Sequence, residues 1–192
     1  MMKKWELALL TGLIAAVVLS QFSAFSAACD EVRGDTLRLH ILANSDTQAD
    51  QAAKLRVRDA LLLEYGNVFS AATDKETAKK LADQYTGCME KTAEKITGLP
   101  VAVKIERMYF GTKEYDSFTM PAGVYDAVRV EIGKAAGHNW FCVMYPPLCL
   151  PAASDESFSA YTEKETDVLK SPYKIKFAAV EWLQKMKTAS VQ

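Results

Sequence analysis

The sequence predicts an α+β fold: a single domain with elements in the order β-α-α-β-β-β-α, preceded by an N-terminal signal or anchor helix. Three observations predict this. Lys3 and Lys4 precede a long uncharged apolar run. Several later runs alternate apolar and polar residues with the period of two that is typical of strands. Two further segments combine helix-capping signals with apolar residues at helical spacing. We therefore expect residues 1–28 to be a signal peptide or membrane anchor and residues 29–192 to be an exported domain.

The N-terminal segment has the properties of an export signal. No charged residue occurs from Leu7 to Ala28, so the segment partitions into a bilayer while the lysines before it stay on the cytoplasmic side. Ser26 and Ala28 fit the small-residue rule for signal peptidase, with cleavage before Cys29. Without cleavage, the same stretch as a helix about 33 Å long is sufficient to span a hydrocarbon core. Both outcomes are compatible with the sequence.

The first half of the domain is predicted to hold one strand and two helices. Alternating apolar and polar residues indicate a strand over 36–43, and helices are expected over 45–65 and 73–97. Each helix begins with a capping box, a Ser or Thr followed three residues later by Gln or Glu: Ser45 with Gln48, and Thr73 with Glu76.

Three strands are predicted in the second half, over 101–110, 124–132 and 139–145. A five-residue loop with glycine at each end, 133–137, joins the last two as a hairpin. The three strands are therefore expected to form an antiparallel meander. The strand over 139–145 is apolar on both faces, which predicts a central place in the sheet.

The C-terminal part is predicted to be a loop followed by a helix. Residues 151–170 are polar, and Ser171 and Pro172 have the residue types favoured at the N-cap and first position of a helix. The residues expected to face inward are Phe177, Val180, Leu183 and Met186.

Composition and motifs exclude several classes of function. The charge of the exported part is −2, because Lys3, Lys4 and Glu6 are removed from a chain of net charge −1. No nucleic-acid partner is expected, since such binding needs a basic face. No CxxC or HxxxH spacing and no glycine-rich phosphate loop occurs, so we expect no metal and no cofactor.

The cysteines and histidines permit one alternative function. A Cys/His enzyme acting on the envelope would combine Cys142 with His40 or His138. Cys142 lies inside an apolar strand, whereas a nucleophilic cysteine usually lies at a helix N-terminus or beside a positive group. We therefore expect no catalytic residues. Cys142 and Cys149 flank a Pro-Pro pair, and export permits a disulfide between them, with two buried thiols as the alternative.

Polar and aromatic residues near two strands predict a partner-binding surface. Arg38 and His40 lie on the face opposite the apolar stripe of the first strand, so packing of that stripe does not need them. His138 and Asn139 follow a hairpin turn, where side chains usually reach solvent. An aromatic side chain would anchor such a surface, unless it belongs to the core. The candidates for partner binding are Arg38, His40, Asn44, Asp46, His138, Asn139, Trp140 and Tyr145.

Two long stretches resemble the stage II sporulation protein R family. The first comprises Leu37–Asp46 and Lys54–Ala60, and the second comprises Pro121–Ala127 and Gly137–Cys149. The resemblance runs from about 35 to 150 and includes the closing helix.

The resemblance implies a role in sporulation. In endospore-forming bacteria such a protein is made in the forespore and exported into the space between the two compartments. There it activates a membrane-embedded aspartic protease of the mother cell, which processes the precursor of sigma-E. The resemblance thus implies an intercellular signal, secreted across the forespore membrane or anchored in it. Its partner would be the extracytoplasmic part of that protease.

Overall fold

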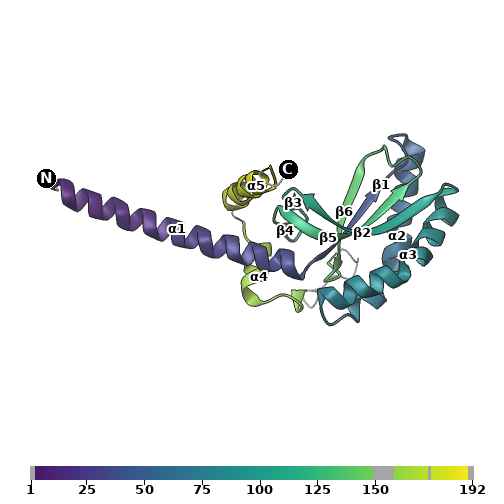
Figure 1. Ribbon diagram of the computed structural model, residues 1–192, viewed down its shortest axis with the longest axis horizontal. Coiled ribbons are helices and arrows are strands. Elements are labelled where there is room, and N and C mark those ends of the chain that lie inside the picture. The colour runs from purple at the N-terminus through teal and green to yellow at the C-terminus, as the bar shows by residue number, and fades with distance from the viewer. Residues whose placement is uncertain (1–2, 149–157, 173, 190–192) are drawn as a thin grey trace. The chain divides into compact units, whose positions relative to one another are not determined.

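The computed structural model describes residues 3–148, 158–172 and 174–189 (Figure 1). The chain divides into two compact units, which are described separately. Unit 1 comprises Met1–Val32, Gly111–Gly123 and Glu163–Gln192, and unit 2 comprises Arg33–Phe110 and Val124–Thr162.

Unit 2 is a four-stranded sheet with two helices on one face, which confirms the predicted α+β class (Figure 1). The strand order is β2-β5-β1-β6. The elements are β1 (Leu37–Leu42), α2 (Gln48–Ser70), α3 (Lys75–Thr97), β2 (Val101–Phe110), β5 (Gly123–Ile132) and β6 (Asn139–Tyr145).

The predicted meander is wrong, because β1 lies between β5 and β6. It pairs in parallel with β5 and antiparallel with β6. β6, predicted to be central, is instead last in the strand order. The physical reason is burial. Five of the six residues of β1 are buried, including Arg38 and His40. A strand that is buried on both faces takes an inner place in the sheet. The polar residues Arg38 and His40 made one face of β1 look exposed in the sequence.

The main core lies between the sheet and the helices α2 and α3. Leu37, Leu39 and Ile41 point toward these helices and are fully buried. Removing each from water contributes about 1.5–3 kcal/mol. From α2, Tyr65 and Phe69 join the same cluster. This explains why α2 continues to Ser70, beyond the predicted end at 65.

Both helix starts differ from the predicted capping boxes. The N-cap of α2 is Thr47, whose side chain accepts a hydrogen bond from the Asp50 backbone at 3.3 Å. The N-cap of α3 is Asp74, which accepts from the Thr77 backbone at 2.7 Å. Ser45 is used elsewhere, since its hydroxyl donates to the Asp50 carboxylate. As predicted, α3 ends before Gly98, which has a positive φ of 68°.

Unit 1 is built around the long N-terminal helix. Its elements are α1 (Lys4–Asp35), β3 (Lys113–Glu114), β4 (Thr119–Met120), α4 (Glu163–Leu169) and α5 (Lys174–Ala189). By length and composition, α1 is able to cross a membrane. It continues as helix past the predicted boundary at residue 28, and α4 occupies part of the predicted 151–170 loop.

A small second core joins α1 to α4 and α5. Phe177 and Val180 of α5 are buried, as predicted, and pack with Phe25, Ala28 and Cys29 of α1 and with Val168 of α4. Met186 does not face inward as predicted, because 43% of it is exposed. It lies on the side of α5 away from this cluster.

Asp126 of β5 forms ion pairs with the start of α3, and its substitution tests how much they stabilise unit 2. Its carboxylate accepts hydrogen bonds from Lys75 at 2.9 Å and Lys79 at 3.0 Å. Burial acts to raise the pKa of Asp126, but the two lysines outweigh it and the pKa lies below its usual value. A depressed carboxyl pKa gives stability that is present above the unfolded pKa and lost as pH falls through the folded value.

We therefore expect Asp126→Asn to lower the free energy of unfolding by about 2 kcal/mol at pH 7. For a chain of this size that is a drop of about 4–8 °C in the unfolding midpoint of the detergent-solubilised protein. The difference from the parent protein should begin to shrink below about pH 4, the usual pKa of an unfolded Asp, and shrink further as pH falls through the lower folded pKa. An equal difference at pH 7 and pH 3 would contradict the ion-pair interpretation.

Candidate partner-binding site

The connection between β5 and β6 passes over the end of β1, and we call this place the crossing (residues 43–46 and 133–138). The backbone amide of Gly137 donates to the Ala43 carbonyl at 2.9 Å. The Asn44 side-chain oxygen accepts from the Lys134 amide at 3.0 Å, and its carbonyl accepts from Ala136 at 3.3 Å. Two segments far apart in the sequence are thereby held as one structural feature.

The backbones at the crossing approach too closely for side chains at both glycines. A Cβ atom at Gly137 would lie 2.3 Å from the Ser45 carbonyl oxygen. Gly133 has a φ of 56°, and a Cβ there would meet the Asn44 side chain at 2.3 Å. The glycines at the two ends of the predicted hairpin loop thus serve the crossing.

Asp46 and His138 join the two segments of the crossing at the surface. The Asp46 carboxylate accepts from the His138 backbone amide at 2.6 Å and also contacts its ring nitrogen Nδ1. These hydrogen bonds from His138, the backbone one first, lower the pKa of Asp46. Both side chains stay open to solvent, with 55% of Asp46 and 78% of His138 exposed. The sequence placed these segments in one surface, and the structure brings them together.

Residues in the first two turns of α2 form hydrogen bonds to the crossing. Asp50 accepts hydrogen bonds from Asn44 at 2.9 Å and from Ser45. Lys54 is buried and donates to the His138 carbonyl at 2.8 Å. Burial lowers the pKa of the Lys54 ammonium. Asp50 and Lys54 were not among the predicted site residues, although their helical spacing beside the first strand was visible in the sequence.

His40 is buried rather than exposed. Its Nε2–H donates to the Asn139 side-chain oxygen at 3.1 Å. Its ring stacks on Phe141, with 4.8 Å between ring centres. The other nitrogen, Nδ1, is buried and has no hydrogen-bond partner among the described residues. Burial therefore lowers the pKa of His40, and the ring is neutral at pH 7.

Arg38 and Tyr145 are also internal, which corrects the expectation that they reach a partner directly. Arg38 is fully buried, and its Nε donates to the Cys142 carbonyl at 3.0 Å. Its guanidinium lies 4.6 Å from the centre of the Phe110 ring. Tyr145 belongs to the main core, where burial raises its pKa. The alternation of β1 correctly predicted that Arg38 and His40 lie on the face opposite Leu37, Leu39 and Ile41. It did not predict that this face is buried as well.

Trp140 is half-buried and stands at the edge of the crossing. It packs against the main core, and the Arg58 guanidinium of α2 lies 4.4 Å from its ring centre. Neighbouring Asn139 is exposed. Among the predicted residues, those at the surface are Asn44 in part, Asp46, His138, Asn139 and Trp140 in part.

The arrangement of β6 separates the groups that a Cys/His enzyme would need. In the pairing register Cys142 faces Leu39 and Phe141 faces His40. Because successive strand residues point to opposite faces, Cys142 and His40 lie on opposite sides of the sheet. Cys142 is also disulfide-bonded, so it offers no thiolate. Its predicted partner Cys149 lies outside the described residues, and that pairing stays a prediction.

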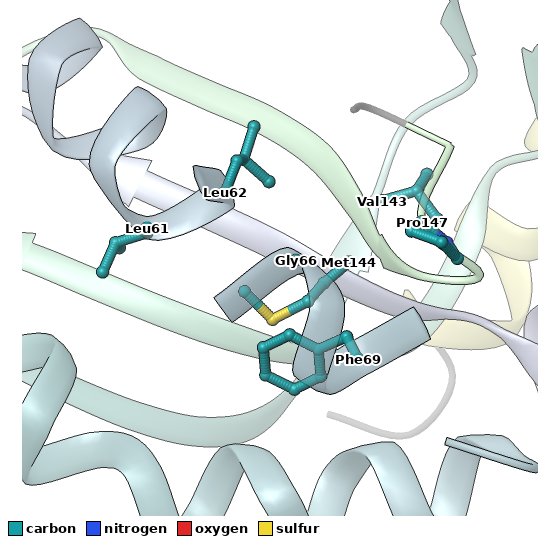
Figure 2. A pocket seen from close by; sticks show the side chains of 7 residues that line it. All are labelled: Leu61, Leu62, Gly66, Phe69, Val143, Met144 and Pro147. Atoms are coloured by element: carbon teal, nitrogen blue, oxygen red, sulfur yellow. The ribbon is translucent and has the colours of Figure 1, made fainter. Parts of the chain in front are cut away.

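A small apolar cavity lies between α2 and β6 (Figure 2). Its volume is about 10 Å³, close to the minimum for one water molecule. The lining residues are Leu61, Leu62, Gly66, Phe69, Val143, Met144 and Pro147. None of these is charged or nucleophilic, so the cavity is part of the packing. Among the described residues no group of His, Cys, Asp and Glu is placed to hold a metal ion.

Comparison with known proteins identifies the family. Residues 33–155 match the family described as Stage II sporulation protein R. The chain belongs to the stage II sporulation protein R family. The matched span contains the crossing, His40 and Trp140, and it leaves out most of α1 and all of α4 and α5.

One relative within the stage II sporulation protein R family is from Bacillus subtilis (strain 168). Named Stage II sporulation protein R, it is 33% identical over 135 residues, which cover 67% of this chain and 60% of the relative. The chain therefore spans less than two thirds of that relative's length. No solved structure matches the chain.

Gly137→Ala tests the close approach at the crossing. The added methyl group cannot be accommodated without moving the Ser45 backbone, and overpacking of this kind typically costs about 1–3 kcal/mol. The control is Gly87→Ala in the middle of α3, where nothing lies within 4 Å of the new atom. That change should be neutral or stabilise by up to about 1 kcal/mol. Thermal unfolding of both variants measures the difference, and equal midpoints would contradict the crossing.

His40 predicts a loss of stability on acidification. Its lowered pKa means that the unfolded chain binds a proton more readily, so stability is full above the unfolded pKa of about 6.5 and falls below it. The unfolding midpoint should drop between pH 7.5 and 5.5. In His40→Gln, which lacks the titrating ring, the midpoint should start lower and change less over that range. An equal pH dependence in both proteins would show that other groups are responsible.

Proposed function

We propose that this chain is an exported signalling protein of sporulation that activates the membrane-bound aspartic protease that processes the sigma-E precursor. Membership of the stage II sporulation protein R family supports a sporulation role. The apolar helix α1 behind Lys3 and Lys4 suits export or anchoring of the domain. The protein then acts as a ligand of the protease and not as an enzyme.

The single observation that carries the proposal is the exposed and rigid crossing. His138 lies in a loop whose backbone is hydrogen-bonded to the residues following β1, and Asn139 begins β6 directly after it. Trp140 supplies an adjacent aromatic side chain, and its ring is already held by Arg58. Binding to a pre-ordered surface avoids the entropy cost of ordering a loop. We assign the contact surface to Asp46, His138, Asn139 and Trp140.

Activation requires that this surface bind the active form of the protease more tightly than the inactive form. Arg38, His40 and Tyr145 then act indirectly, by holding β1 and β6 beneath the surface. His40 is the connecting residue, because its hydrogen bond orients Asn139. A neutral His40 keeps this bond at pH 7.

The alternative, a thiol-dependent envelope enzyme, has little support in the geometry. His40 and Cys142 point to opposite faces of the sheet, and the sulfur of Cys142 is in a disulfide. We therefore retain the signalling function alone.

His138→Ala is the sharpest test, because it removes an exposed ring and leaves the backbone hydrogen bond to Asp46 in place. A residue central to binding typically contributes about 2 kcal/mol, which is roughly 30-fold in affinity. We expect His138→Ala and Asn139→Ala to weaken binding to the extracytoplasmic part of the protease and to reduce processing of the sigma-E precursor. Binding is measured with the purified full-length protein, and processing in sporulating cells.

The matched control is Lys91→Ala, an exposed residue of α3 in the same unit. It should leave binding, processing and the unfolding midpoint unchanged. His138→Ala should also leave the midpoint within about 2 °C of the parent. If His138→Ala and Asn139→Ala both fold normally and activate the protease fully, the contact surface lies elsewhere.

A further inference from the structure

The outward face of α5 is apolar. Outside α1, the large apolar side chains exposed in the described part of the chain are Leu63 on α2 and three on α5. The three are Ile175, 86% exposed, Trp182, 62%, and Met186, 43%. They are seven and four residues apart, so they form one stripe along the helix. An exposed apolar stripe of this kind is usually buried against a partner or a membrane, and the residues around it indicate which of the two.

Lysines border the stripe on both sides. Lys174 and Lys185 lie along one edge, and Lys176 and Lys187 lie along the other, since each pair is about three helical turns apart. Such side chains lay their methylene groups on apolar surface and keep the ammonium in a polar layer. An apolar stripe between two rows of lysine is the pattern of a helix that lies in a membrane interface and attracts anionic lipid.

The acidic residue of this helix is engaged elsewhere. Glu181 accepts a hydrogen bond from the Thr112 backbone at 3.1 Å and pairs with Lys185 at 2.9 Å. It therefore holds α5 to the segment before β3. Lys174 in turn pairs with Glu114 at 2.9 Å.

The opposite face of α5 is fastened to α1 within unit 1. The Phe177 ring meets the Phe25 ring edge-on, with 5.2 Å between their centres. The Lys176 ammonium lies 5.4 Å from the centre of the Phe25 ring. Val180 packs in the same cluster with Ala28 and Cys29. The position of α5 along α1 is thus determined.

That position coincides with the outer boundary of a membrane. A hydrocarbon core about 30 Å thick takes about 20 helical residues, which from Leu7 end near Ser26. The side chains of α1 from Leu7 to Gln21 are exposed, and protein contacts begin at Phe22. Phe25, and α5 packed on it, therefore lie where hydrocarbon meets the lipid headgroups. Tryptophan concentrates at this depth.

We propose that α5 lies on the outer surface of the membrane that α1 crosses, with the stripe of Ile175, Trp182 and Met186 in lipid. The lysines along the two edges of the stripe then lie at the depth of the headgroup phosphates. This arrangement requires α1 to be retained after export, because Phe25 and Ala28 form part of the surface on which α5 rests. It is independent of protease activation.

Fluorescence quenching in vesicles tests the proposal with the full-length chain. Vesicles of phosphatidylcholine and phosphatidylglycerol contain a fraction of lipid brominated near the top of the acyl chains, which quenches nearby tryptophan. Trp5→Phe leaves Trp140 and Trp182, and Trp5→Phe/Trp182→Phe leaves Trp140 alone. We expect the brominated lipid to quench the first protein and to lose most of that effect on the second.

The variant Trp182→Phe is the control for insertion, since it keeps Trp5 at the other end of α1. If the brominated lipid quenches this variant but not Trp5→Phe, then α1 has inserted while α5 faces water or protein, and the proposal is overturned. Detection in cells of a chain that begins at Cys29, with no intact chain in the membrane fraction, would overturn it as well.

Discussion

The insertion of β1 between β5 and β6 is the constraint on which unit 2 depends. β5 and β6 are consecutive in the chain, but β1 lies between them in the sheet. The segment that connects them must therefore cross the end of β1. Buried backbone groups at such a crossing need partners. Asn44 and Asp46 provide them for the loop, and Gly133 and Gly137 allow the approach. Residues that resemble a binding motif in the sequence are thus also structural.

The elements of the fold were predictable from local patterns, and their arrangement was not. Apolar alternation located three strands of the four-stranded sheet, and a continuous apolar run located β6. The start signals of α2 and α3 lay within two residues of the observed caps. The order of the strands depends on which faces are buried, and β1 was misleading because Arg38 and His40 look like surface residues. Arg38 is buried against Cys142 and the Phe110 ring. The contacts that allow Arg38 to be buried come from two other strands, so the local sequence of β1 does not reveal them.

The candidate site was predicted in part for the same reason. His138 and Asn139 follow a turn and do reach solvent, and the two predicted segments do meet. His40 lies on the face of β1 that was assumed to be open, and Tyr145 belongs to the main core. Asp50 and Lys54 support the crossing through the start of α2, and they were missed because their partners lie on other segments of the chain. The two histidines therefore have opposite roles, one internal and neutral, the other exposed beside a carboxylate.

The strand order also bears on the proposed export of the chain. His40 and Asn139 are hydrogen-bonded although 99 residues separate them, and β1 pairs in parallel with β5 only after both helices and β2 have intervened. Contacts so distant in sequence form late and slowly. On the proposed export route, in which the segment after α1 crosses before the C-terminal part, the chain cannot complete this sheet until β6 is available. Late pairing of β6 would leave the chain unfolded enough to pass through a membrane channel on that route.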